Sequence, residues 1–249
     1  MWDSHGRERI TMLHDVTKTS KQEDAIGFLD RVARTPTNRR QFLRWAGVSI
    51  MVAAVAGCSK DNPVSPAVGV NLGTGDTAVL NYAYALEQLE AAFYTQVVAT
   101  PYSGISAAEL QMMTEIRDHE VIHRNFFKAA LGASAIADLS VTFASVNFTS
   151  RASVLATAKT FEDLGVSAYN GAGQLLASAA YLTLAGKIVS VEARHASAIR
   201  DLLAPKTASF AGDDVVNVTT GLDAVRSPSQ VLALADPFVV TPINRGDLP

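Results

Sequence analysis

The sequence predicts an all-α protein in which two helical hairpins, joined by a long crossover, form a four-helix bundle with a C-terminal extension. Hydrophobic residues make up 48% of the chain and charged residues 18%, a composition typical of a packed helical protein. Apolar residues recur at helical spacing in four segments between residues 76 and 203. Residues 132–149 lack this period. Fully extended they reach about 60 Å, which is enough to cross the length of a bundle of helices that rise about 1.5 Å per residue.

Residues 1–57 are predicted to be an export signal rather than part of the fold. Arg39 and Arg40 stand side by side ahead of a short apolar run that ends in VAGC at Cys58. The run is too short to span a bilayer comfortably, and the pattern resembles a twin-arginine signal with a lipoprotein cysteine. A short membrane anchor or a cytosolic helix is the alternative. On the signal interpretation, Cys58 is lipidated and the protein is anchored in the cell envelope, on its periplasmic face.

Residues 58–75, rich in proline and glycine, are predicted to be a tether between the lipid and the folded domain. Residues 1–57 hold nine basic and six acidic residues, so residues 58–249 carry a formal net charge of −6. A chain with that charge has no basic field to attract nucleic acid. Cys58 is the only cysteine, which excludes an intrachain disulfide and a cysteine-held metal cluster.

The bundle is predicted to occupy residues 76–203. The first helix begins at about Asp76 and stops before Pro101, and the second begins after Ser106, where SAAE is typical of a capping box with Glu109. The second helix stops at Leu131, before a glycine. A third helical segment starts at residue 150 and weakens at NGAG (170–173), and a fourth runs from about residue 181 to 203.

Residues 204–249 are predicted to form a C-terminal extension with one short helix. The segment SPSQVLALAD has Ser227 and Gln230 at the spacing of a capping box and Pro228 at the first helical position.

Acidic residues and histidines recur in the four helical segments in a repeated pattern. The second and fourth segments each carry Glu-x-x-His, as Glu120 with His123 and as Glu192 with His195. The first and third segments align as LEQLEAAFY (86–94) and FEDLGVSAY (161–169). This alignment matches Glu87 with Glu162 and Tyr94 with Tyr169, which indicates an internal duplication.

Antiparallel pairing places these side chains at one level of the bundle. Glu87 lies about as far before the first hairpin turn as Glu120 lies after it, and the second hairpin has the same symmetry around residue 177. Buried carboxylates cost several kcal/mol each unless they are compensated, and two divalent cations would compensate four of them. Carboxylate and imidazole donors suit iron or manganese. The pattern therefore predicts a centre with two Fe or two Mn ions, and a salt-bridged polar core without metal is the alternative.

Several segments resemble the ferritin-like superfamily, especially its desiccation-related proteins from plants and bacteria. The resemblance covers residues 76–203 and is carried by LNYAYALEQLEAAFY (80–94), FEDLGVSAYNGAG (161–173) and VEARHASAIRDL (191–202). It implies a ferritin-like bundle with Glu120 and Glu192 as bridging ligands. The full ligand set that it implies is Glu87, Glu120, His123, Glu162, Glu192 and His195.

Three assignments around the predicted centre have alternatives. Glu90 lies one turn after Glu87 on the same helix face and could replace it as a ligand, although the repeat aligns Glu90 with Gly165 and so favours Glu87. Tyr94 and Tyr169 could be redox-active catalytic residues, hydrogen-bond partners of the ligands, or ordinary core residues. His119 is expected to be solvated or to lie behind a ligand.

The expected function is that of an exported dimetal redox protein. Its small-molecule substrate would be dioxygen or peroxide, and the reaction would be of the ferroxidase, peroxidase or catalase type. The alternative is a non-catalytic envelope protein that protects or scaffolds during desiccation or other stress and keeps a structural or vestigial metal site.

Export gives the first testable prediction. Replacing Arg39 and Arg40 by lysine should hold the protein in the cytoplasm, because the paired arginines are what the twin-arginine route recognises. Cell fractionation and mass spectrometry of the envelope form measure this, with processing expected immediately before Cys58. Unimpaired export of the double variant would contradict the twin-arginine assignment, and a mature form that retains residues ahead of Cys58 would contradict lipidation.

Overall fold

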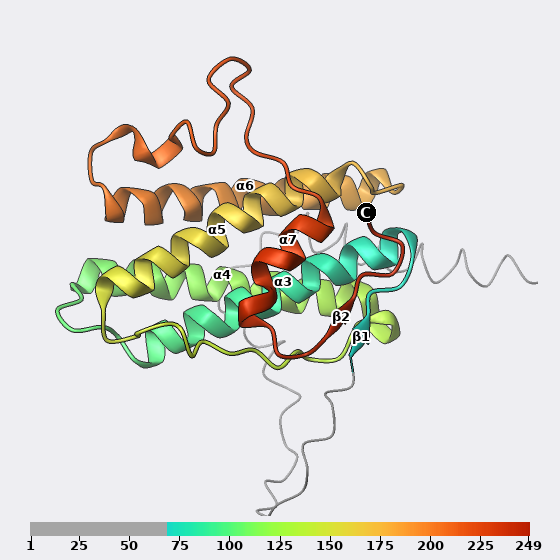
Figure 1. Cartoon of the computed structure of the whole chain (residues 1–249), viewed down its shortest axis with the longest axis horizontal. Coiled ribbons are helices and arrows are strands. Elements are labelled where there is room, and N and C mark those ends of the chain that lie inside the picture. Colours follow the sequence, from blue (N-terminus) through green and yellow to red (C-terminus); the bar gives the residue numbers. More distant parts are fainter. Residues whose placement is uncertain (1–68) are drawn as a thin grey trace, which may run out of the picture. The chain divides into compact units, whose positions relative to one another are not determined.

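The computed structural model describes residues 69–249, which form a four-helix bundle of two hairpins (Figure 1). Helices α3 and α4 pack against each other as the first hairpin, and α5 and α6 pack as the second. The predicted fold class is therefore confirmed. The long helices are α3 (Gly75–Ala99), α4 (Ala107–Leu131), α5 (Arg151–Gly173) and α6 (Ala179–Leu203). Short 3-10 turns cover Gly132–Ser134, Ala208–Ala211 and Asp236–Phe238.

Serine side chains cap three of the four long helices. The hydroxyls of Ser106, Ser150 and Ser178 accept hydrogen bonds from backbone N–H groups in the first turns of α4, α5 and α6. The capping box predicted at Ser106 is only half present, because the Glu109 carboxylate does not return to the Ser106 backbone. It accepts a 2.8 Å hydrogen bond from Nε of Arg151 instead and so joins α4 to α5.

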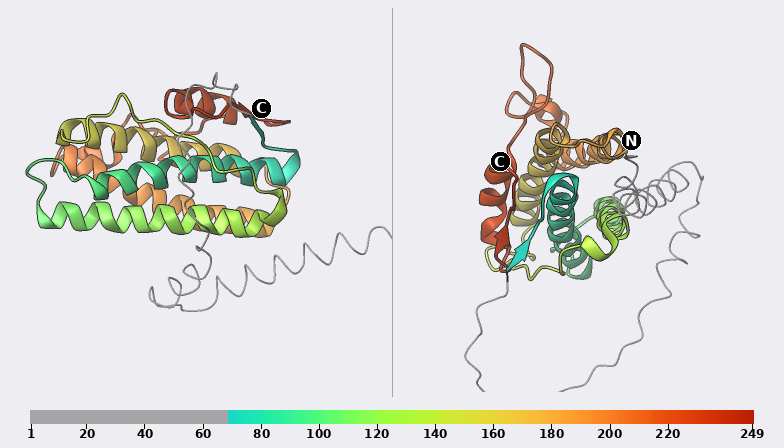
Figure 2. Two further views of the ribbon diagram at one scale, coloured as in Figure 1. Left: turned by 90° about the horizontal axis from the view of Figure 1, so that it is seen from below. Right: turned by 90° about the vertical axis from the view of Figure 1, so that its right-hand side faces the viewer.

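The crossover between the hairpins is held by polar side chains on one face of α3. Asn81 donates to backbone carbonyls of Leu72 and Ser134 and accepts from the N–H of Ile136. Gln88 accepts from the N–H of Leu139 at 2.7 Å. Figure 2 shows this connection running along the length of the bundle. These buried polar residues of α3 therefore belong to the crossover rather than to the predicted metal site.

The two ends of the described chain meet in a small parallel pair of strands. Strand β1 (Val70–Asn71) pairs with β2 (Ile243–Asn244), and the following Leu72 is fully buried. Residues 70–72 therefore belong to the folded domain and not to the predicted tether. The Gly- and Pro-rich sequence gave no sign of this, because the partner strand lies far away in the sequence, at residues 243–244. The short helix α7 (Pro228–Ala235) forms as predicted, with both hydrogen bonds of the Ser227 and Gln230 capping box.

Gly171 lies in NGAG (170–173), where the sequence predicts that the third helix weakens. The helix continues through it to Gly173, and a Cβ atom at Gly171 would lie 1.8 Å from the carbonyl oxygen of Arg226. The Arg226 N–H donates to the carbonyl of Ser167 at 3.1 Å. The glycine therefore lets the C-terminal extension lie directly on α5.

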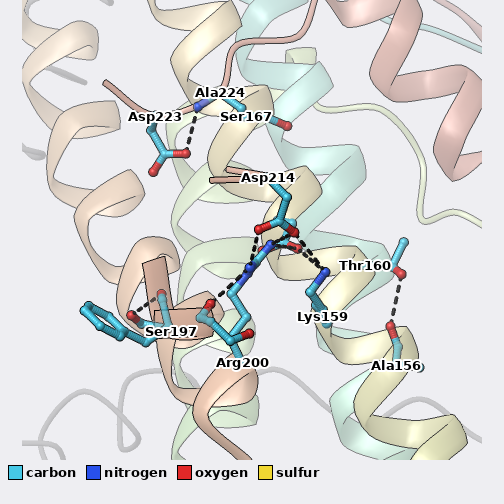
Figure 3. A network of polar contacts seen from close by, with 12 residues as sticks. Ala156, Lys159, Thr160, Ser167, Ser197, Arg200, Asp214, Asp223 and Ala224 are labelled. Carbon is cyan, nitrogen blue, oxygen red and sulfur yellow. Dashed lines mark hydrogen bonds and ion pairs between the residues drawn. The ribbon is translucent and has the colours of Figure 1, made fainter. Parts of the chain in front are cut away.

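Arg200 of α6 joins the second hairpin to the C-terminal extension. Its guanidinium binds Asp214 of the extension at 2.8 and 3.0 Å (Figure 3). It also binds Asp163 of α5 at 2.7 and 2.8 Å. It also donates to the carbonyl of Ser209 at 3.1 Å. The Arg200 side chain is only 2% exposed. A buried guanidinium with this many partners is costly to disrupt, because removing it leaves the two carboxylates with only the ammonium group of Lys159, at 3.5 and 3.4 Å.

The predicted signal segment, with Arg39, Arg40 and Cys58, lies outside the described residues. Among residues 69–249, no helix combines the length and the apolar character that crossing a membrane requires.

The Arg200 contacts predict a large stability effect. Replacing Arg200 by methionine should lower the free energy of unfolding by about 3 kcal/mol, because Asp163 is then left with little compensation in a largely buried position. Urea denaturation followed by circular dichroism measures the change. Arg117→Met, which breaks an exposed pair with Asp118, is the control and should change stability by less than about 1 kcal/mol. Equal effects of the two variants would contradict the role given to Arg200.

Candidate metal centre

Four helices bring the six residues of the repeated Glu and His pattern into one layer of the bundle core. Helix α3 supplies one glutamate and α5 another, while α4 and α6 each supply a Glu-x-x-His pair. The four carboxylates are fully buried, and the two imidazoles are 9% and 5% exposed. The six residues are Glu87, Glu120, His123, Glu162, Glu192 and His195.

These residues form two overlapping groups that each offer three carboxylates and one imidazole. Within each group the potential ligand atoms lie within 4.8 Å of one another. Glu120 and Glu192 belong to both groups. Glu87 and His123 complete one group, called the Glu87 half below, and Glu162 and His195 complete the other, the Glu162 half.

The imidazoles reach across the bundle in a nearly symmetric way. Nδ1 of His123 on α4 lies 2.8 Å from Glu192 on α6, and Nδ1 of His195 on α6 lies 2.9 Å from Glu120 on α4. Each Nδ1 also lies 3.5 Å from the carboxylate that is unique to its half, Glu87 or Glu162. Both histidines therefore direct the same ring nitrogen at the same layer of carboxylates.

Two tyrosines complete the symmetry by crossing between α3 and α5. Tyr94 of α3 donates a 2.5 Å hydrogen bond to Glu162 of α5, and Tyr169 of α5 donates to Glu87 of α3. Burial and the adjacent carboxylate, Glu162 or Glu87, raise the pKa of each hydroxyl well above 10. The tyrosines are therefore protonated donors that hold one oxygen of each carboxylate. Of the three roles considered for them, this is the role of hydrogen-bond partners of the candidate ligands.

The electrostatics of the layer show a dense negative charge held in place by the imidazoles. Burial and Glu192 raise the pKa of Glu120 to about 8. Burial also opposes ionisation of Glu192, but the adjacent imidazoles of His123 and His195 hold the pKa of Glu192 at about 2. Burial lowers the pKa of His195, but Glu162 and neighbouring carboxylates outweigh it and raise the value to about 12. In the protein alone, protons on the imidazoles and on Glu120 balance the remaining charge.

The residues fit a pair of divalent cations. Eight oxygen and nitrogen atoms of the six residues are buried without a hydrogen-bond partner among the described residues, including both oxygens of Glu120 and of Glu192 and Nδ1 of each histidine. Buried polar atoms normally have partners, and these all face one another within the two groups. Four carboxylates carry a charge of −4, which two divalent ions would cancel. The two groups are consistent with a binuclear metal site.

Glu90, the alternative to Glu87, lies outside both groups although it is only 3% exposed. Its carboxylate packs against α5 at Gly165, where a Cβ atom would lie 3.1 Å from Oε1 of Glu90. Burial and the neighbouring glutamates raise the pKa of Glu90 well above its usual range. Gly165, the residue that the repeat aligns with Glu90, therefore leaves space for the Glu90 side chain, which is a fifth buried acid beside the layer.

His119 lies behind the candidate ligand His195, which is one of the two positions expected for it. Its Nδ1 lies 2.9 Å from Nε2 of His195, and the two rings stack with centroids 5.1 Å apart. This hydrogen bond fixes the His195 ring with Nδ1 toward the carboxylates, which is how an outer partner orients a metal-binding histidine. The helical spacing could only place His119 about 100° from Glu120, and the packing of α4 against α6 was needed to show its partner.

The geometry defines a class of protein, a four-helix bundle with a buried binuclear-type Glu/His site. Comparison with known families gives the same result, since residues 75–205 match the ferritin-like domain family. The chain belongs to this family. A search of curated proteins found no match.

The unequal environments of Glu120 and Glu192 predict opposite effects in metal-free protein. A folded-state pKa raised to about 8 means that Glu120 costs stability as pH rises from about 4.5 to 8. Glu192, with its pKa held at about 2, stabilises the fold above about pH 4.5 and loses this effect as pH falls toward 2. At pH 7 in chelator, Glu120→Gln should raise the free energy of unfolding by about 1 kcal/mol or more, and Glu192→Gln should lower it by about 3 kcal/mol.

Chemical denaturation from pH 4 to 8 measures these effects. The stability of Glu120→Gln should match wild type at the acidic end and exceed it increasingly toward pH 8, since Glu120 of wild type ionises in the unfolded chain over this range while it stays protonated in the fold. Parallel pH profiles for wild type and this variant, or a stabilised Glu192→Gln, would contradict the charge distribution described above.

Proposed function

We propose that this protein is a dimetal oxidoreductase that uses two iron or two manganese ions to react with dioxygen or peroxide. The observation that carries the proposal is the pair of overlapping, buried groups, each with three carboxylates and one imidazole, whose facing atoms have no hydrogen-bond partner in the part of the chain that the structure describes. Membership of the ferritin-like domain family supports it.

The arrangement suggests how the residues divide the work. Glu87 and His123 would hold one ion and Glu162 and His195 the other, while Glu120 and Glu192, which are common to both groups, would bridge the two. Carboxylates can bind through one oxygen or two, so they can follow a change in the charge of the ions. Imidazole and carboxylate donors suit Fe and Mn in particular.

The protein's own groups restrict the chemistry that such a centre performs. Two redox-active ions held there would supply one electron each, which with two protons converts dioxygen to hydrogen peroxide, or hydrogen peroxide to two molecules of water. Tyr94 and Tyr169 hold Glu162 and Glu87 in place by donating to one oxygen of each. Full burial of the four carboxylates excludes bulk water from the layer.

We further propose that the protein acts in the cell envelope and belongs with the desiccation-related ferritin-like proteins. The support is the sequence pattern of Arg39 and Arg40 ahead of an apolar run and Cys58, together with the quoted motifs of the helices. The twin-arginine route carries folded, cofactor-loaded proteins, which suits a centre assembled before export.

Metal binding and turnover test the main proposal. The purified chain, loaded with Fe(II) or Mn(II) without oxygen, should bind two ions, melt at a higher temperature than in chelator through ligand linkage, and consume dioxygen or hydrogen peroxide. Glu162→Ala and Glu192→Ala should each lower the bound metal, measured by elemental analysis, and reduce turnover at least tenfold. Glu115→Gln, which lies on α4 outside both groups, should behave as wild type.

Two outcomes would count against the proposal in different ways. No metal in wild type, with a large destabilisation of metal-free Glu120→Gln, would indicate a salt-bridged polar core. Two bound ions with no turnover of either substrate would favour the stress-protective scaffold with a structural metal site.

A further inference from the structure

One end of the bundle contains an apolar pocket that reaches toward the Glu87 half of the site. Residues of α3, α4, α5 and α6, and Leu176 of the connection between α5 and α6, line it, and all of them are Ala, Val, Leu, Phe, Tyr or Gly. Leu176, Leu184 and Ala185 are half-buried at its rim, whereas Ala83, Leu86 and Ala168 are buried deeper in it. Its cavity volume is about 20 Å³, which is enough for a molecule of one or two small atoms.

Two of the buried lining residues lie directly against residues of the Glu87 half. Tyr169 lines the pocket and donates its hydroxyl proton to the Glu87 carboxylate. Phe127 lines it as well, one helical turn after His123, with its ring centroid 6.3 Å from that of Tyr169. The inner end of the apolar pocket is therefore one side chain away from the candidate ligands Glu87 and His123.

The corresponding place beside the Glu162 half is filled by phenylalanines. The ring of Phe93 packs edge-on against Tyr94, whose hydroxyl holds Glu162, and also against Phe161, both with centroids 5.1 Å apart. Phe161 in turn packs against Phe238 at 4.8 Å. This phenylalanine cluster consists of Phe93, Phe143, Phe148, Phe161 and Phe238.

Comparison of the two internal repeats shows which substitutions make the two halves differ. The alignment that matches Tyr94 with Tyr169 also matches Phe93 with Ala168 and Phe161 with Leu86. The helix positions that carry large rings in the cluster thus carry smaller side chains in the pocket. The other three phenylalanines of the cluster come from the crossover and the C-terminal extension, which lie outside the repeated hairpins.

From this asymmetry we propose that the apolar pocket binds a small uncharged molecule, dioxygen, and admits it to the Glu87 half of the centre only. The inference rests on the proposed function and narrows it. An apolar diatomic molecule gains by leaving water for an apolar pocket, whereas hydrogen peroxide must give up hydrogen bonds to water that, in this lining, only the tyrosine hydroxyls could replace. Ala168 is the residue that keeps the route open, and Phe93 is the one that closes its counterpart.

Xenon binding to metal-free protein tests the pocket without any need for turnover. Xenon is an apolar probe that occupies dry cavities, and xenon NMR or xenon-pressurised crystals locate it. Wild type should bind one xenon beside Ala168 and Tyr169, Ala168→Phe should bind none there, and Phe93→Ala should bind a second one beside Tyr94. Ala156→Phe, an exposed position on the same helix α5, is the matched control and should bind as wild type does.

A second pocket variant guards against misfolding. If Ala168→Phe does not fold, as judged by circular dichroism, Ala83→Leu narrows the pocket from the α3 side and should weaken xenon binding at least tenfold. Absence of xenon from wild type, or xenon binding that survives in the folded pocket variants, would overturn the inference.

Stopped-flow oxidation of protein loaded with Fe(II) or Mn(II) connects the pocket to dioxygen. The folded pocket variant should react with dioxygen at least tenfold more slowly than wild type and Ala156→Phe, while its reaction with hydrogen peroxide slows by a smaller factor. An unchanged dioxygen rate would overturn the proposed route. If wild type binds xenon but does not react with dioxygen, the proposed redox function fails, and if it reacts but binds no xenon, only the pocket inference fails.

Discussion

The burial of four carboxylates in a single layer is the constraint on which the rest of this structure depends. Each of Glu87, Glu120, Glu162 and Glu192 is removed from water completely, and together they would repel one another strongly in a low-dielectric interior. The bundle compensates with two imidazoles directed into the layer and two tyrosine hydroxyls that donate into it. Within residues 69–249, the buried atoms of this layer that have no hydrogen-bond partner include Nδ1 of both imidazoles, and these atoms are the ones best placed to bind cations.

Compensation by crossed contacts also ties the two hairpins together. Tyr94 and Tyr169 each donate a hydrogen bond to a glutamate of the other hairpin. The glutamate nearest to His123 is Glu192, and the glutamate nearest to His195 is Glu120, so each histidine also contacts the other hairpin. The site and the hairpin interface are therefore one set of interactions. A change in the charge of this layer is expected to be felt as a change in fold stability.

The departures from symmetry arise from segments that are not repeated. The crossover and the C-terminal extension run over α3 and α5, supply phenylalanines beside Tyr94, and are fastened by Asn81, Gln88 and Arg200. Beside Tyr169 the repeat carries Ala168 and Leu86 in place of the two phenylalanines, and the apolar pocket lies there. A duplicated scaffold thus has two halves with nearly equal ligand geometry and unequal surroundings.

The sequence by itself determined the helices, their pairing into hairpins and the candidate residues of the site. Helical periodicity is a local property, and Glu87, Glu120, Glu162 and Glu192 could be placed at one level because distance along a helix is proportional to residue number. The Ser227 cap of α7 followed from local spacing in the same way. The internal repeat also favoured Glu87 over Glu90, and Glu87 belongs to one of the two groups whereas Glu90 belongs to neither.

Only the tertiary structure decided what depends on rotation and contact between distant segments. Whether Tyr94 faces its own helix's acid or Glu162, and whether His119 meets solvent or His195, depends on how helices pack, which residue spacing does not specify. Residues 70–71 pair with residues 243–244, and Arg200 binds Asp214. No pattern in the sequence links the segments that these two contacts join. Local sequence determines helices because their hydrogen bonds are local, whereas these contacts exist only once the whole chain has packed.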